Sequence, residues 1–557
     1  MSQYGVPLGR DGRRYTAPPM AGDLSGKVVV LGLDGATWDL LRPLAERGVM
    51  PNLAQALERG RHGGLESCLP PYSSPAWVSI ATGKSPGTHG IFDFWEAGAP
   101  GEKRLVSSHS ARGAKLWDLV DAAGKVANVV AVPVSFPPAR LEHGRFVCGM
   151  FTPGEDVDYT WPHELKAELK AIPGGYEADP FALGLEGLEF IEQTQFWIRQ
   201  QEIAVRRLLD KGDWDLLFTV IQAPDPLQHK FWNVLDPMDP RFDAARAADE
   251  LEPLEESYRR CDQVIGDRLV MAERGATVLI VSDHGFGRFE KLFFINRALE
   301  GYGLLTRSGG TPGISRSGLS TRTVIDAIRR LDVLGLEKRV PTSVRERLAR
   351  GIDSALSQPI DAEQTIAYAA AASAESVFIA DWVPEDERRE VGRCVIDVLE
   401  AARDPETGER IIEHAYLRED VYDGSELHRI PDVLIDFGER PYTASDRLAA
   451  GGIVERIPDA AGGGRHRRTG VILALGPGIA AGELTGARIV DVAPTALHAM
   501  GLAVPDDMDG RVLTELFSDG REVRTEPGRA RDAEEEVVYT EEEEAAIEQS
   551  LKNLGYI

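Results

Sequence analysis

Aspartate and histidine side chains stand beside several apolar stretches of this chain. Three of them directly follow runs of aliphatic residues, two lie four residues apart in QAPDPLQHKFW, and one lies in the Gly-rich start of GGGRHRRTGVILALGPGI. Carboxylate and imidazole ligands together favour Zn²⁺, and Mn²⁺ or Fe²⁺ can also bind to them. The six candidate metal ligands are Asp34, Asp225, His229, Asp283, His284 and His466.

Each candidate ligand also has a purely structural interpretation. Asp34 and Asp283 would serve as turn or cap carboxylates, and His284 as a buried histidine with ordinary hydrogen bonds. Asp225 would open the Pro-Asp-Pro turn, although His229 at i+4 shares its helix face and could bind the same ion. Carboxylates gathered in one crevice need a cation to offset their repulsion, so the combination favours a metal site. Three carboxylates and three imidazoles divide naturally between two ions.

Two adjacent serines lie in the stretch PPYSSPAWVSIATGKSPGTHGIFDF. Ser73 and Ser74 stand between proline-rich turn residues and the apolar run 76–81, which predicts a rigid turn leading into a helix. Serine at a helix start often only caps the helix. The same position also lets backbone N–H groups bind an anion, so either serine could take part in chemistry on an anionic substrate.

These residues must be positioned by strands that alternate with helices. We expect an α/β fold, in which a mostly parallel sheet is sandwiched between helices, with a helical insertion. In such sheets the carboxyl ends of the strands face one crevice, where the first five candidate ligands would converge. His466 reaches it only if its loop folds back over that edge. The expected early strands are 28–33, 126–134, 216–222 and 276–282, with helices over 38–59, 114–123, 190–211 and 254–274.

The domain organisation is predicted from changes in composition. The stretch 306–323 is rich in Gly, Ser and Thr, and basic helical segments follow it. These segments could cap the site and meet an anion with their arginines, although a solvated helix face is the commoner role of such charges. Thr540 and Glu543 form a capping box for a final helix. We expect a disordered leader (1–26), a catalytic core (27–304), a helical insertion (305–364), the second part of the core (365–520) and a charged tail with a helix over 541–554 (521–557).

The charge of the 557-residue chain limits its partners. A formal net charge of −27 argues against a nucleic-acid polymer or an anionic membrane surface, yet allows a small anionic substrate drawn in by metal ions. The four cysteines form no CxxC pair, and neither a signal peptide nor a membrane span is evident. We therefore expect a cytoplasmic protein without a membrane partner. The oligomeric state stays open, because the acidic C-terminal helix could dock on the body or on another subunit.

Six motifs, in their order along residues 28–517, carry a resemblance to a known family. They are LGLDG, PPYSSPAWVSIATGKSPGTHGIFDF, PDPLQH, SDHGFG, HRRTGVILALGPGI and DVAPTALHAMGL. The chain resembles the alkaline phosphatase superfamily, in particular its type I phosphodiesterase and nucleotide pyrophosphatase branch with the uncharacterised phosphohydrolase/phosphomutase relatives. The resemblance implies that Ser73, and not Ser74, is the nucleophile. It also implies two ligand groups, one for each zinc ion: Asp34, Asp283 and His284, and Asp225, His229 and His466.

Two departures from related patterns bear on the substrate. Phe94 stands where nucleotide pyrophosphatases have a phosphate-contacting Asn, which argues against nucleotide diesters. Sulfatases need x-Pro-x-Arg after the modified residue, and Ser73-Ser74-Pro75-Ala76-Trp77 ends in Trp. Ser74 and Phe94 remain candidate substrate-binding residues.

Three functions are compatible with these residues. The first is a two-metal phosphoric ester hydrolase that acts on a small phosphate ester through a phosphoserine at Ser73. The second is a phosphomutase, which would return the phosphoryl group to another hydroxyl of a sugar. The third is a catalytically silent binding or scaffold protein. The complete set of ligands argues against this third function.

Overall fold

A computed structural model describes most of the chain. The described residues are 23–97, 103–172, 174–178, 184–308, 360–370, 375–448, 451–457, 463–518, 520–528 and 539–554.

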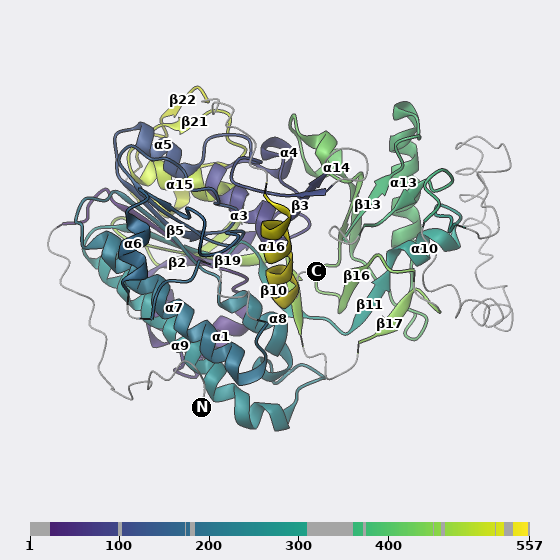
Figure 1. The fold of residues 1–557 in the computed structure, drawn as a ribbon, viewed down its shortest axis with the longest axis horizontal. Helices are drawn as coiled ribbons and strands as arrows, with labels where there is room; N and C mark the ends of the chain where they lie inside the picture. Colours follow the sequence, from purple (N-terminus) through teal and green to yellow (C-terminus); the bar gives the residue numbers. More distant parts are fainter. Residues whose placement is uncertain are drawn as a thin grey trace.

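A nine-stranded sheet forms the centre of the larger lobe (Figure 1). The sheet is mostly parallel, because only β19 and β7 run against their neighbours. This confirms the expected α/β fold class. In spatial order the strands are β20 (Gly482–Arg488), β2 (Arg61–Glu66), β19 (Thr469–Leu475), β9 (Thr277–Val281), β1 (Val28–Leu33), β8 (Leu216–Ile221), β5 (Ala127–Val132), β6 (Arg145–Cys148) and β7 (Thr160–Trp161).

The middle strands are apolar because helices cover both of their faces. β1 pairs in parallel with β8 on one side and β9 on the other, and every residue of these three strands is buried. One helical layer holds α1 (Trp38–Glu46), α2 (Pro51–Arg59), α6 (Leu165–Lys170), α7 (Gly187–Leu209), α8 (Pro224–Leu235) and α9 (Ala244–Glu273). The other holds α3 (Ser73–Thr82), α5 (Leu116–Ala122) and α15 (Val492–Ala499), with α4 (Pro86–His89) beside α3.

The prediction of a single helix over 38–59 is wrong, because two helices occupy this segment. Gly48 adopts the left-handed backbone conformation (φ +75°), which ends the first helix, and Pro51 begins the second. The expected helices over 190–211 and 254–274 are present as α7 and α9, with α9 starting ten residues earlier than expected.

A second lobe has a hydrophobic core of its own, which the sequence analysis does not predict. Residues 433–436 form a strand in a sheet of this lobe and not in the main sheet. The antiparallel strands β10 (Gly285–Arg288) and β18 (Gly464–Arg467) connect the main lobe to the second lobe. The limits of the domains remain predictions.

The second lobe is built from two small sheets and their helices. One sheet contains β12 (Ala367–Tyr368), β13 (Ser376–Ile379), β15 (Val433–Asp436) and β14 (His414–Leu417), in that spatial order. The other contains β16 (Tyr442–Ser445), β11 (Lys291–Phe294) and β17 (Val454–Arg456). The helices are α10 (Ile295–Gly301), α13 (Glu385–Ala401), α14 (Arg418–Val421) and the 3₁₀ turn η4 (Leu427–Arg429).

Most of the expected insertion and leader lies outside the described residues. The two ends of the insertion lie side by side, because Arg307 and Ile360 form an antiparallel bridge. Leu24, at the end of the expected leader, is buried and donates its N–H to Arg274 O (2.9 Å), so it packs on the body.

The expected C-terminal helix is confirmed as α16 (Glu541–Leu554). The Thr540 backbone N–H donates to the Glu543 carboxylate (2.7 Å), and the Glu543 N–H donates to Thr540 Oγ1 (3.2 Å).

All four cysteines are free and buried. Among the helices of the described residues, we find none that combines the length and apolar character needed to cross a bilayer.

Candidate active site

The first ligand group lies at the ends of two neighbouring parallel strands. Asp34 directly follows β1, and Asp283 and His284 follow β9. The Nε2 atom of His284 lies 3.2 Å from Asp283 Oδ2 and 3.7 Å from Asp34 Oδ1. Adjacent parallel strands place all three side chains at one edge of the sheet, and each is fully buried.

The second ligand group comes from a helix and a strand. Asp225 and His229 lie one turn apart on α8, which follows β8, with 3.5 Å between Asp225 Oδ2 and His229 Nε2. His466 lies on β18, opposite Phe286 of β10, and its Nε2 is 3.1 Å from Asp225 Oδ1. The strand pair therefore brings His466 to the same sheet edge.

Each group gathers its ligand atoms within the reach of one ion. In both groups, one ligand atom from each residue lies within 4.8 Å of those of the other two. The two groups also adjoin each other, because His284 Nε2 is 3.9 Å from Asp225 Oδ1 and the rings of His284 and His466 stack at 3.7 Å. The structure thus brings all six expected ligands together.

Backbone carbonyls fix the orientation of two imidazole rings. His284 Nδ1 lies 3.0 Å from Gly285 O, and His466 Nδ1 lies 2.9 Å from Pro71 O. Because a carbonyl oxygen only accepts, each Nδ1 carries the proton and each Nε2 presents a lone pair to the site. His229 Nε2 lies 2.9 Å from His466 Nε2, so the two ring nitrogens face each other.

The two carboxylates of the first group have no lysine or arginine beside them among the described residues. Asp34 Oδ1 and Asp283 Oδ2 accept no hydrogen bond, and neither residue pairs with a lysine or arginine in the described part of the chain. Burial, followed by the charge of its aspartate neighbours, raises the pKa of Asp34 well above its usual range. Burial likewise raises the pKa of Asp283 to about 7. Divalent cations would satisfy these oxygens, so the donor set fits two such ions.

Ser73 is the first residue of α3 and is fully buried beside the first group. Its Oγ lies 3.1 Å from His284 Nε2. The prolines of the preceding turn and the helix start hold the serine rigidly, and the first amides of a helix have no partner within the helix. Ser73 thus combines a hydroxyl at the ligand cluster with an anion-favouring helix end.

The two residues suggested for substrate binding lie close to Ser73 but are buried. Ser74 Oγ has no hydrogen-bond partner among the described residues. Phe94 packs against Tyr72 and Phe151, with ring centroids 6.2 Å and 5.7 Å apart. Their role in substrate binding stays a prediction.

Sequence reasoning misses the residues that support the ligands. Trp77 donates its indole N–H to Asp34 Oδ2 (2.9 Å), and the Gly35 N–H donates to Asp283 Oδ1 (3.1 Å). The i+4 spacing of Trp77 from Ser73 places both on one face of α3, which is the available signal for a shared site.

The family of the chain follows from comparison with known proteins. A model of the type I phosphodiesterase / nucleotide pyrophosphatase family matches residues 28–452. The chain belongs to this family. It is accordingly a metal-dependent phosphohydrolase of the alkaline phosphatase superfamily. None of the curated proteins matches the chain.

Solved structures resemble this chain at low sequence identity. Phosphonoacetate hydrolase from Sinorhizobium meliloti 1021, in complex with phosphonoformate, is 16% identical with a TM-score of 0.51, over 86% of this chain and 96% of that one. Murine ectonucleotide pyrophosphatase / phosphodiesterase 5 is 13% identical with a TM-score of 0.46, over 88% of this chain and 100% of that one. The similarity to the hydrolase supports the fold.

Proposed function

We propose that this family member hydrolyses phosphoric esters through a covalent phosphoserine on Ser73. One observation carries the proposal: the Ser73 hydroxyl, at the start of a helix, touches a cluster of six ligands that separates into two groups. A pair of divalent cations, with Zn²⁺ favoured by the donor set, would stabilise the attacking and leaving oxygens at phosphorus. The natural setting we propose is the cytoplasm, and the substrate a small phosphate ester.

The reaction takes place in two displacements. The Ser73 hydroxyl gives up its proton as its oxygen forms a bond to phosphorus, the bond between phosphorus and the leaving oxygen breaks, and the released alkoxide takes up a proton in turn. Water then attacks the phosphorus of the phosphoserine, the bond between phosphorus and the Ser73 oxygen breaks, and that oxygen takes back a proton supplied by the water. The product is phosphate from a monoester and a phosphate monoester from a diester. Of the backbone N–H groups at the start of α3, those of Ser73 and Ser74 would hold oxygens of the phosphoryl group, because Pro75 has no N–H.

The test is the variant Ser73→Ala, assayed on p-nitrophenyl phosphate and bis(p-nitrophenyl) phosphate with Zn²⁺ supplied. We expect kcat to fall on the order of 1,000-fold or more, because the covalent route is lost. Acid quenching during turnover of a ³²P-labelled ester should place the label on the peptide that contains Ser73. The matched control is Ser257→Ala, which removes a buried serine of α9 that bonds only to Pro253 O in the described structure.

Three outcomes would overturn the proposal. Near wild-type turnover by Ser73→Ala would exclude the serine as the nucleophile. Label that moves to an added sugar phosphate, in preference to water, would assign a phosphomutase. Purified protein that holds neither zinc, manganese nor iron, and shows no turnover when supplied with them, would favour a silent binding protein.

A further inference from the structure

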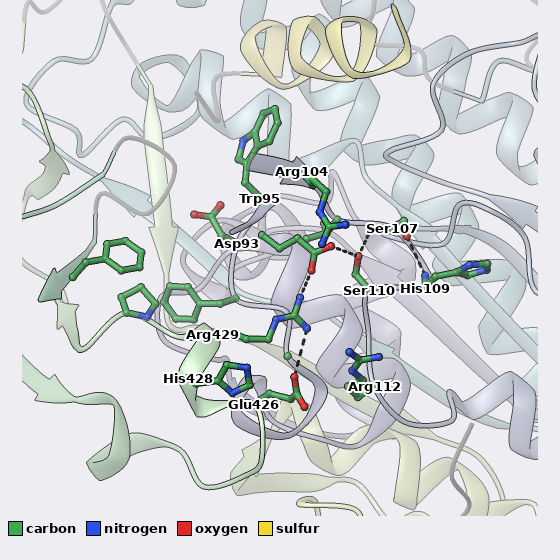
Figure 2. Close-up of a pocket in the computed structure, with 16 residues that line it drawn as sticks. Asp93, Trp95, Arg104, Ser107, His109, Ser110, Arg112, Glu426, His428 and Arg429 are labelled. Atoms are coloured by element: carbon green, nitrogen blue, oxygen red, sulfur yellow. Dashed lines mark hydrogen bonds and ion pairs between the residues drawn. The ribbon is translucent and has the colours of Figure 1, made fainter. Parts of the chain in front are cut away.

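A cavity of about 470 Å³ lies where the two lobes meet, next to the turn that leads out of α4 (Figure 2). Its walls come from residues 90–96, which lead into and begin β3 (Trp95–Ala97), and from residues 104–112, which include part of β4 (Lys103–Leu105). The second lobe contributes Phe378 of β13 and residues 426–431. The volume suits a small molecule or a substantial part of one.

Three arginines surround this cavity. Figure 2 shows Arg104, Arg112 and Arg429 gathered about the same space, the first two from the segment 104–112 and the third from the second lobe. Arg429 is held in place by two carboxylates, because it forms an ion pair with Glu96 and a second, 3.6 Å ion pair with Glu426.

Arg112 differs from Arg429 in its pairing. Its side chain is exposed, and it forms no ion pair with a carboxylate of the described residues. Hydroxyl groups complete this wall: Ser110 Oγ donates to Glu96 Oε1 (3.0 Å), and Ser107 Oγ accepts the N–H of His109 (3.2 Å). Guanidinium groups beside hydroxyls are the side chains that bind carboxylates and phosphates.

Contacts connect the cavity to the helix that begins with Ser73. Arg112 donates its backbone N–H to His89 O (2.8 Å), and the ring of His89 lies 2.9 Å from Ser79 Oγ in the middle of α3. At the other end, Asp93 lines the cavity, and its neighbour Phe94 packs on Tyr72, the residue before Ser73. One pair of packed rings, Phe94 and Tyr72, therefore connects this wall of the cavity to the turn that holds Ser73.

We propose that this cavity binds a second anionic group, a carboxylate or a phosphate, on the leaving part of the substrate. The inference rests on the proposed function and specifies its substrate class: phosphate esters whose alcohol also carries a negative charge. Three carboxylates, Asp93, Glu96 and Glu426, line the cavity together with the arginines, and two of them pair with Arg429. The attraction for the added anion therefore comes from Arg112, which forms no ion pair with a carboxylate of the described residues.

The experiment compares two esters whose leaving groups have similar acidity, phenyl phosphate and 4-(carboxymethyl)phenyl phosphate. We expect wild-type kcat/KM to be about 10-fold or more higher for the carboxylated ester, as one charge-assisted contact permits. Arg112→Gln should abolish this preference and leave kcat/KM for phenyl phosphate within about 2-fold. Arg112 is exposed, so its substitution should not disturb folding. The matched control is Arg389→Gln, an exposed arginine of α13 that pairs with Glu419 and Asp420.

A binding measurement separates this inference from the proposed function. Calorimetric titration with 4-hydroxyphenylacetate should show binding to the wild type and its loss in Arg112→Gln, with phenol as the uncharged probe. Binding without turnover of either ester would overturn the proposed function and leave the cavity assignment standing. No binding of 4-hydroxyphenylacetate, or binding that Arg112→Gln does not weaken, would overturn the cavity assignment alone. If 4-hydroxyphenylacetate binds at the cavity and the carboxylated ester gains nothing, the anion comes from a separate ligand and the proposal for the substrate is wrong.

Discussion

The two ligand groups are held by different parts of the molecule. Asp34, Asp283 and His284 follow two neighbouring strands of the main sheet, so the hydrophobic core of that sheet fixes their backbone. His466 in the second group lies on β18, outside the main sheet, and depends on contacts with the second lobe. The main sheet therefore sets the positions of the first group, whereas the positions of the second group also depend on how the two lobes are joined.

Alternation along β18 explains this dependence. Neighbouring residues of a strand point to opposite faces, so His466 faces the ligand cluster and the arginines on either side of it face away. Arg465 Nη2 donates to the carbonyls of Gly438 and Arg440 (both 3.2 Å), and Arg467 Nη1 donates to the same two oxygens. Two arginines thus attach the strand of His466 to a loop of the second lobe.

The largest expected effect is the loss of a ligand from either group. Asp34→Asn and His466→Ala should each lower kcat for p-nitrophenyl phosphate on the order of 1,000-fold, because chemistry at phosphorus uses both cations. Metal analysis should find one ion per chain in each variant where the wild type holds two. Two retained ions in His466→Ala would show that the second group does not depend on β18.

Metal removal should affect stability through the first group. In metal-free protein, the folded state keeps protons on Asp34 and Asp283, whose pKa values lie above the ordinary value near 3.9, while the unfolded state releases them. These two groups therefore bind more protons in the folded state than in the unfolded state. Their contribution to the free energy of unfolding is largest below about pH 4 and falls as the pH rises toward about 7. The pKa values of His229, His284 and His466 are lowered by burial, so these three groups act in the opposite direction over the same pH range. The contribution of the carboxylates is therefore measured as a difference between two proteins, by urea unfolding in EDTA.

A matched variant makes this pH test specific to the buried carboxylates. Asp34→Asn removes one of the titrating groups, so the metal-free variant should lose less stability over this pH range than the metal-free wild type. Saturating Zn²⁺ should reduce the slope in the wild type. A slope that is changed neither by the Asp34→Asn substitution nor by the metal would assign the pH dependence to other groups.

The sequence predicts the first ligand group better than the second, for a physical reason. Val28 to Leu33 is an uninterrupted aliphatic run ending in an aspartate, and a buried parallel strand is the structure that satisfies such a run. His466 has no such local signal, because its place depends on pairing with β10. The second core is missed for the same reason: the strand around Val433 has the composition of a main-sheet strand, and only tertiary pairing assigns it to another sheet.

The attachment of β18 should matter less than the ligands themselves. Arg467→Met removes the bonds to the second lobe and leaves no buried charge behind, since its acidic partner Glu439 is 84% exposed. We expect the affinity for one of two ions to weaken about 10- to 100-fold, as for other groups that position a ligand. Competition with a calibrated chelator measures it. Arg389→Met on the surface of α13 is the control, and an equal effect in both variants would show a general loss of stability in the second lobe.

The smallest expected effect concerns the first group, whose supporting hydrogen bond comes from within the main lobe. Trp77→Phe removes the indole donor to Asp34 Oδ2, so we expect about 10-fold weaker metal binding together with a modest loss of stability. Trp117→Phe is matched for the loss of volume, because Trp117 is a buried core tryptophan whose indole nitrogen has no hydrogen-bond partner among the described residues. If the two variants lose the same stability but only Trp77→Phe loses metal affinity, the sheet alone does not fix Asp34, and α3 shares in its placement. Equal metal affinity in both variants would instead show that the strand ends are sufficient to hold the first ion.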